Sequence, residues 1–128
     1  MLEQNPDKVK IVFKHFPLGS HQFAALASLA ATAAQSQGKF WQYNKMIFDN
    51  YRQLTPEKFQ KFAKELNLNM PLFNKQMNSK ESKERVSTDF RDGREAGVTG
   101  TPTIYINGRL LRKRSLPAIQ KIIDQELK

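Results

Sequence analysis

The sequence predicts one α/β domain in which a block of helices separates a short strand from a C-terminal hairpin and helix. Val9–Phe13 contains a short apolar run, made by Val9, Ile11, Val12 and Phe13, which is typical of a buried strand. Residues 20–96 place apolar side chains at helical spacing, and Asn107-Gly108 between two apolar runs is a strong signal for a tight hairpin. With 128 residues, 39% of them hydrophobic, and no cysteine, the chain can build one modest core without disulfides.

Capping residues divide the helical block. Ser20 is the expected N-cap of the first helix, which stops at Gly38. Thr55 precedes a proline at the first position of the third helix, and Ser79 caps the fifth, which stops at Gly97. The five expected helices are His21–Gln37, Lys39–Asn50, a third that begins at Pro56, Asn69–Met77, and a last one from Ser79 to Ala96.

The C-terminal part is predicted to be a hairpin followed by a helix. Thr103–Ile106 is β-branched and aromatic, Asn107-Gly108 turns it, and Arg109–Leu111 is the return strand. Pro102 lies at the mouth of the first strand, where its missing N–H does least harm. Ser115 opens the terminal helix. The apolar residues of that helix fall on one face: Leu116, Ile119, Ile122, Ile123 and Leu127.

The formal charge of +9 is spread along the chain. Only Arg109, Arg112, Lys113 and Arg114 form a compact cluster, and no zinc finger, helix-turn-helix or RNA-binding aromatic motif accompanies it. Specific nucleic-acid binding is therefore not expected. Leu2–Asp7 is too short and polar for a signal peptide, and no apolar run is long enough to insert into a membrane.

Single residues outside the hairpin indicate no catalytic, cofactor or metal site. His15 and His21 have no cysteine and no obvious carboxylate partner, so surface or loop positions are expected for them. The aromatic residues Phe40, Trp41 and Phe48 either line a ligand groove or pack in the core, and their helical context favours the core.

Gly97–Gly108 reads Gly-Val-Thr-Gly-Thr-Pro-Thr-Ile-Tyr-Ile-Asn-Gly and resembles the cis-proline loop and hairpin of DsbA-like thiol oxidoreductases. Lys8–Leu18 resembles their second strand and the turn after it, and Gln37–Phe48 resembles part of their helical insertion. The resemblance implies a truncated thioredoxin-like α/β fold. It makes residues 1–128 one incomplete domain, with 20–96 as the inserted helical subdomain.

The family's Cys-x-x-Cys lies after a first strand, upstream of the region that Lys8–Leu18 resembles, and no residue here matches it. The resemblance implies that Thr101 offers its backbone to an extended substrate, that the Thr101–Pro102 bond is cis, and that Gly100 belongs to the same site. The implied partners are unfolded or extended polypeptides, and the implied location is the periplasm or cell envelope. The resemblance assigns no catalytic residue, cofactor or metal to this chain.

Two functions follow as hypotheses. The first is a portion of a DsbA-like thiol–disulfide oxidoreductase that is redox-inactive as given, because thiol chemistry needs a cysteine. The alternative is a non-catalytic thioredoxin-like module that holds peptides or a partner through the same loop. Relatives of glutathione transferases and isomerases are a weaker third reading, because they need a serine or cysteine in the missing first helix.

The implied lack of a central strand has a structural consequence. It leaves unpaired edges on Val9–Phe13 and on Thr103–Asn107, and unpaired edges attract other chains. We expect a homodimer through the Val9–Phe13 edge. The alternative is that these two strands pair directly with each other.

Overall fold

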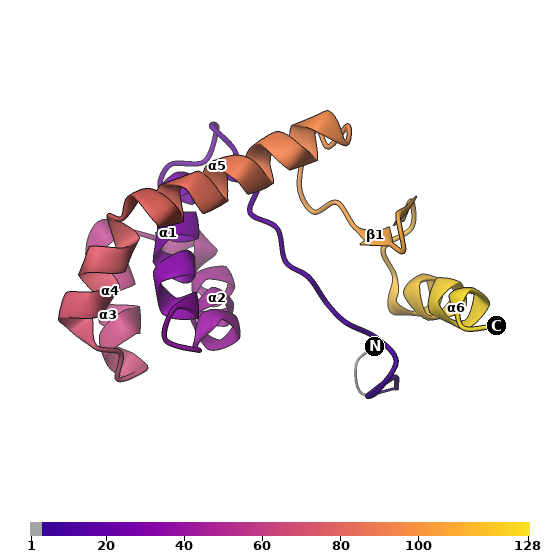
Figure 1. Ribbon diagram of the computed structural model, residues 1–128, viewed down its shortest axis with the longest axis horizontal. Coiled ribbons are helices and arrows are strands. Elements are labelled where there is room, and N and C mark those ends of the chain that lie inside the picture. Colours follow the sequence, from indigo (N-terminus) through magenta and orange to yellow (C-terminus); the bar gives the residue numbers. More distant parts are fainter. Residues whose placement is uncertain (1–3) are drawn as a thin grey trace. The chain divides into compact units, whose positions relative to one another are not determined.

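The computed structural model describes residues 4–128, which divide into two compact units (Figure 1). The helical unit is Lys14–Gly97. The hairpin unit holds the described residues up to Phe13 together with Val98–Lys128. The helical unit contains α1 (Ala24–Gln35), α2 (Phe40–Asp49), the 3-10 turn η1 (Tyr51–Gln53), α3 (Pro56–Glu65), α4 (Met70–Met77) and α5 (Lys80–Glu95). The hairpin unit contains β1 (Tyr105–Ile106), β2 (Arg109–Leu110) and α6 (Leu116–Glu126).

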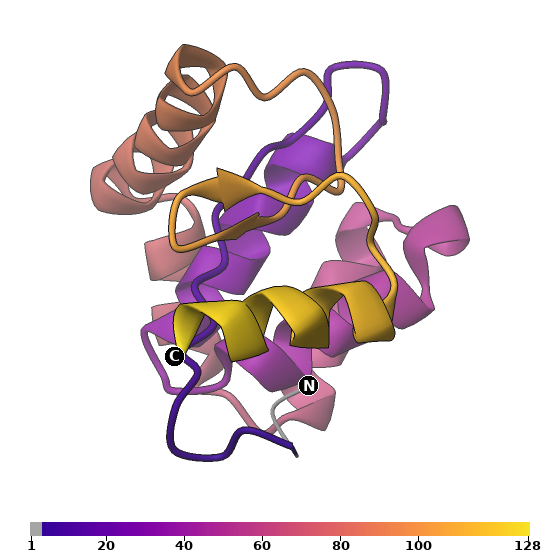
Figure 2. The same cartoon turned by 90° about the vertical axis from the view of Figure 1, so that its right-hand side faces the viewer.

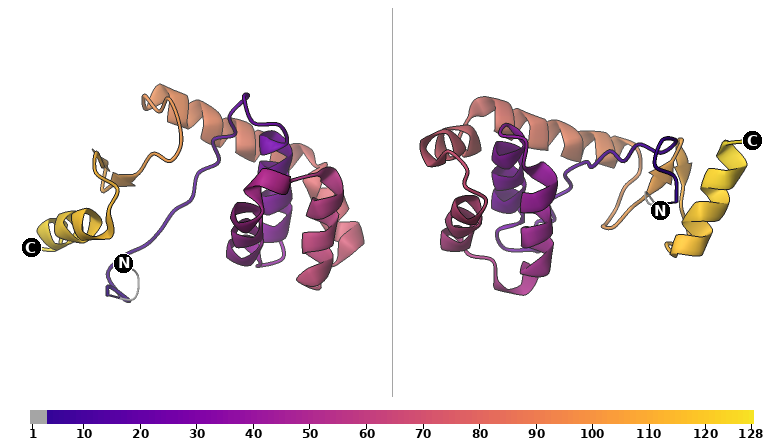
Figure 3. Two further views of the ribbon diagram at one scale, coloured as in Figure 1. Left: turned by 180° about the vertical axis from the view of Figure 1, so that it is seen from behind. Right: turned by 90° about the horizontal axis from the view of Figure 1, so that it is seen from below.

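The helical unit is built around α1, which packs against α2, α4 and α5 (Figures 1 and 3). The sequence of α1 is rich in alanine, and its small buried side chains let the neighbouring helices approach closely. Large aromatic residues from α2, α3 and α4 then fill the core, and the largest fully buried side chains are those of Tyr43, Phe59 and Phe73. The core therefore combines a slim central helix with aromatic side chains from the helices around it.

Local capping fixes most helix starts. The side chains of Thr55, Ser79 and Ser115 each accept a hydrogen bond from the backbone N–H three residues on, which confirms these caps. The predicted cap at Ser20 is wrong. The first helix begins later, after Phe23, whose φ is 68° and whose side chain makes no cap. The chain turns before the helix starts, where the N–H of His21 donates to the Leu18 carbonyl over 3.1 Å.

The predicted strand at Val9–Phe13 is also wrong. This segment has no strand structure, and the sheet of the described residues has only β1 and β2, so the two predicted strands do not pair directly. The side chains of Ile11 and Val12 are 40% and 62% exposed. β propensity describes how a residue fits a sheet, but a strand exists only where its backbone has a partner.

The hairpin has the predicted turn but shorter strands. Tyr105 pairs with Leu110 and Ile106 with Arg109, and positive φ angles of 47° and 81° at Asn107 and Gly108 give the expected tight turn. Figure 2 shows the hairpin beside α6. Contacts at the end of α6 join the two, since a guanidinium nitrogen of Arg109 lies 3.5 Å from a carboxylate oxygen of Glu126.

The expectation that the aromatic residues of α2 lie in the core is only partly met. Trp41 and Phe48 are 54% and 57% exposed, whereas Phe40 is partly buried against the core. The buried face of α2 consists of Tyr43, Asn44 and Ile47, so helical rotation turns the other two aromatic residues outward.

Candidate functional site

The loop before β1 contains all three residues that the sequence analysis assigns to substrate binding. Thr101 and Pro102 are exposed and Gly100 is half-buried. The peptide bond between Thr101 and Pro102 is cis. Thr101 and Pro102 are therefore at the surface of the hairpin unit.

Two hydrogen bonds hold this loop in shape. The hydroxyl of Thr103 donates to the Gly100 carbonyl over 2.6 Å. The guanidinium of Arg114 donates to the carbonyl of Pro102. Beyond the loop, the N–H of Leu111 donates to the Ile104 carbonyl over 2.8 Å, which extends the hairpin pairing by one residue. The loop is thus fixed by its own side chain and by the segment that follows the return strand.

The contact of Arg114 was not predicted from the sequence, although a signal for it was present. In a hairpin with a two-residue turn, the residues that face each other follow from counting outward from the turn. Counting outward from Asn107-Gly108 brings Arg114 to the level of the Thr101–Pro102 pair. The sequence alone marks Arg114 only as part of a basic cluster.

Gly100 does not adopt the positive φ that a loop glycine is free to take. A Cβ atom built on Gly100 would meet no other atom within 4 Å. Neither backbone conformation nor crowding by the described residues therefore requires glycine here. The space beside Gly100 is open, and so a bound chain could occupy it.

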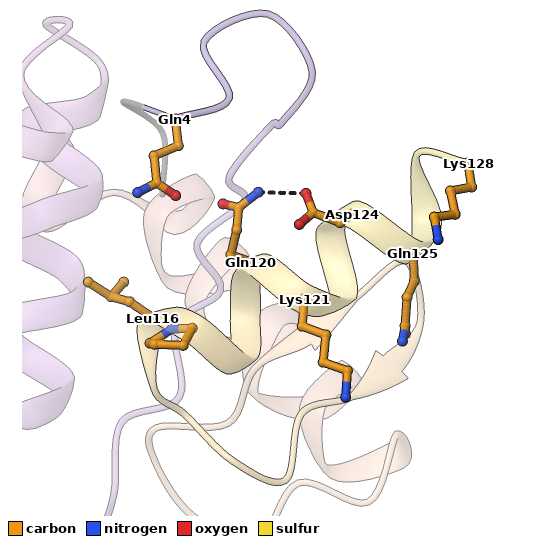
Figure 4. A pocket seen from close by; sticks show the side chains of 8 residues that line it. Gln4, Leu116, Gln120, Lys121, Asp124, Gln125 and Lys128 are labelled. Atoms are coloured by element: carbon orange, nitrogen blue, oxygen red, sulfur yellow. Dashed lines mark hydrogen bonds between the residues drawn. The ribbon is translucent and has the colours of Figure 1, made fainter.

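A groove of about 570 Å³ lies elsewhere in the hairpin unit, along α6 (Figure 4). Its residues include Gln120, whose amide nitrogen donates to Asp124 over 2.9 Å and to Asn5 over 3.1 Å. The side chains of Asn5 and Gln120 exchange a second hydrogen bond of 2.8 Å, which attaches the N-terminal segment to α6. Neither Thr101 nor Pro102 lines this groove. The predicted site is therefore an exposed segment that lies outside this groove.

His15 lies in a segment without helix or strand, as expected for a loop position, but it is buried in the helical unit and is not at the surface. Its Nε2 is 3.2 Å from the Thr32 hydroxyl oxygen, which itself donates to the Ser28 carbonyl over 2.8 Å. The histidine nitrogen must therefore donate to Thr32. Burial lowers the pKa of His15 below its usual 6.5, the nearby carboxylate of Asp89 opposes that shift, and Arg85 adds to it.

Asp89 forms its contacts with the segment before α1. It accepts a hydrogen bond of 3.1 Å from the backbone N–H of His15, and its carboxylate lies 3.7 Å from the ammonium nitrogen of Lys14. In the part of the chain that the structure describes, no three histidine, cysteine, aspartate or glutamate residues are grouped to hold a metal ion. None of the helices among residues 4–128 is both long and apolar enough to cross a bilayer.

Known proteins match most of the length of this chain. A family model described as thioredoxin matches residues 2–125. The probable disulfide bond formation protein D of Bacillus anthracis is 30% identical over 129 aligned positions, which cover 94% of this chain and 59% of that protein. The Na(+)/H(+) antiporter NhaA 3 of Salinispora tropica is 31% identical over 102 residues, or 79% of this chain and 16% of the antiporter.

A solved structure has the same fold. The oxidoreductase DsbA from Xylella fastidiosa superposes with a TM-score of 0.73 at 17% sequence identity, over 98% of this chain and 74% of that one. The chain therefore spans about three fifths of its disulfide-formation relative and about a sixth of the antiporter. The thioredoxin-like fold expected from the sequence is confirmed.

Proposed function

This chain belongs to the thioredoxin family and is DsbA-like, and we propose that it is the substrate-loop portion of a thiol–disulfide oxidoreductase. In its full-length form such a protein oxidises or isomerises the disulfides of secreted proteins in the periplasm or cell envelope. The portion described here supplies the surface that holds the polypeptide substrate. The thiol chemistry belongs to a Cys-x-x-Cys that this sequence does not contain.

The observation that carries this proposal is the exposure of Thr101 and Pro102 on a loop held by two hydrogen bonds. An extended polypeptide can bind such a segment through main-chain hydrogen bonds, as peptides do when they add a strand to a sheet edge. Thr101 is the residue that offers its N–H and C=O, and the open space beside Gly100 leaves room for the bound chain. Because the loop is already held in shape, little ordering entropy opposes binding.

Titration of the isotope-labelled chain with an extended, unfolded polypeptide tests this binding role. We expect amide shifts at Gly100, Thr101 and Thr103. Thr101→Pro removes the N–H that pairs with the substrate and should abolish those shifts. Thr99→Pro is the matched control, because Thr99 is another exposed threonine of the same loop. Shifts that avoid this loop, or equal effects of the two substitutions, would refute the role.

The chain as given has no redox activity in this proposal. A thiolate is the nucleophile of disulfide exchange, and the hydroxyls of serine and threonine cannot cycle through a disulfide. The cysteine-free chain should therefore neither reduce insulin nor oxidise a dithiol peptide above background. A rate that rises with the concentration of this chain, with contaminating oxidoreductases removed, would contradict the assignment of the chemistry to a missing segment.

The cysteine-free sequence also favours a second candidate, a non-catalytic thioredoxin-like module that binds peptides or a partner chain through the same loop. The two candidates differ in what precedes the matched region in the gene. An in-frame strand followed by Cys-x-x-Cys supports the oxidoreductase. A continuous reading frame without that motif supports the binding module.

A further inference from the structure

We propose that Arg112 and Lys113 select the polypeptide that binds at Thr101–Pro102, and that the preferred ligand is an extended chain with acidic side chains beside the bound segment. This inference rests on the proposed function, because it names the substrate class of the same loop. It concerns side chains that the family resemblance did not assign to any role.

The hairpin register places the basic segment beside the loop. Leu111 donates to Ile104 in continuation of the antiparallel pairing of β1 and β2. The same register continued by two residues sets Arg112 at the level of Thr103, and Lys113 at the level of Pro102. The hydrogen bond from Arg114 to the Pro102 carbonyl shows that this segment does run alongside the loop.

The basic side chains of the cluster differ in the contacts that they make. Arg114 is bound to the loop carbonyl, and Arg109 forms an ion pair with Glu126. Arg112 and Lys113 are exposed, and neither forms an ion pair with any described carboxylate. Two cationic groups next to the proposed binding backbone are therefore available to a ligand.

The surrounding sequence strengthens this positive field. From Ala96 to Ile123 the chain carries five basic residues and no acidic one. Clusters of one sign on a surface attract ligands of the opposite sign and orient them as they bind. A polypeptide with aspartate or glutamate next to its extended segment complements this surface, whereas one with lysine is repelled.

Two extended peptides of equal length and apolar content, one with aspartates and one with lysines flanking the central segment, test the proposal on the full chain. We expect both sets of amide shifts to centre on Gly100–Thr103 and the acidic peptide to bind about three- to tenfold more tightly at low salt. High salt should remove most of this preference. Equal affinities with shifts at the loop would overturn the charge selection while the proposed function stands. If neither peptide shifts the amide signals of the loop, the charge selection and the proposed function are both refuted.

Charge-reversal variants separate a local effect from the overall positive charge. Arg112→Glu/Lys113→Glu should abolish or invert the preference for the acidic peptide. Lys83→Glu/Arg91→Glu on α5 is the matched control, because it makes the same charge change at two exposed residues of the helical unit. An equal loss of the preference for the acidic peptide in the control variant overturns the proposal.

A single-stranded oligonucleotide with the same charge as the acidic peptide gives a further test. If it binds at the same amides at least as tightly, the proposal is overturned, because the cluster would then be a general surface for polyanions.

Discussion

The phenolic hydroxyl of Tyr43 on α2 donates a hydrogen bond to the backbone carbonyl of Phe59 on α3 over 2.9 Å, in the centre of the helical unit. Burial raises the pKa of Tyr43, so this phenol stays a protonated donor. Removing only the hydroxyl with Tyr43→Phe leaves a buried carbonyl without that partner. We expect the free energy of unfolding to fall by about 1–2 kcal/mol, measured by denaturant titration.

Tyr51→Phe is the control for this prediction. Tyr51 is 61% exposed, and its hydroxyl accepts a hydrogen bond from Arg52 at the surface. Water can replace that contact, so we expect a change within about 0.5 kcal/mol. Equal losses in the two variants would show that the buried hydrogen bond adds nothing specific to the core.

The burial of His15 predicts that acid weakens the helical unit. Its pKa is lower in the folded chain than the value near 6.5 in the unfolded chain, so the unfolded chain binds more protons between the two values. The contribution of His15 to stability is complete above the unfolded pKa and is lost as the pH falls from there through the folded pKa. The slope can reach about 1.4 kcal/mol per pH unit for one proton.

His15→Gln removes the titrating ring but keeps an amide that can donate to Thr32. Unfolding free energies measured from about pH 7.5 to about pH 5 should fall less steeply for this variant than for the natural chain. His21→Gln is the control, because His21 is exposed. If the natural chain and His15→Gln change in parallel over this range, the proton linkage assigned to His15 is wrong.

Replacing serine by alanine should change the stability differently at the cap of α5 and inside that helix. The hydroxyl of Ser79 accepts a hydrogen bond of 3.1 Å from the N–H of Ser82, so Ser79→Ala should destabilise the chain by about 1 kcal/mol. Ser87 is exposed inside the helix, where alanine has the higher helix propensity, so Ser87→Ala should be neutral or stabilising by a few tenths. Thermal unfolding of both variants measures the difference.

The same caps explain how much of the fold was predictable. Thr55, Ser79 and Ser115 act on backbone groups three residues away, and so their effect is present in the local sequence. The Asn107-Gly108 turn is local in the same way. A strand at Val9–Phe13 depends instead on a partner distant in the sequence, and β propensity carries no information about whether that partner is present.

The candidate site also combines residues that the local sequence indicates with contacts that it does not. Its motif residues Thr101 and Pro102 are read from a contiguous stretch, and the structure exposes both. The support from Arg114 depends on the hairpin register, which follows from the position of the Asn107-Gly108 turn. The interior position of His15 depends on Thr32 and Asp89, which are far from it in the chain, and no local pattern indicates that contact.

We propose that two chains self-associate by pairing through Val9–Phe13, although this segment is not a strand in the single chain. The side chains of Ile11 and Val12 are exposed. Among the described residues, the backbone N–H and C=O groups of Lys10, Ile11 and Val12 form no hydrogen bond with other backbone groups. A second copy can supply those hydrogen bonds by strand addition and bury the apolar side chains at the same time. We therefore expect an average mass that rises with concentration in sedimentation experiments.

Val12→Lys tests this edge because it places a charge where the two chains would meet. Each chain of the dimer loses one buried valine, about 1.5 kcal/mol apiece, so the dimer should weaken about a hundredfold. Leu127→Lys is the matched control, since Leu127 is also a large exposed apolar residue of the hairpin unit but lies outside the edge. A monomer at all accessible concentrations, or equal weakening by the two substitutions, would mean that Val9–Phe13 does not pair two copies. Fast amide exchange of Ile11 and Val12 at high concentration would lead to the same conclusion, because paired strand amides are protected from solvent.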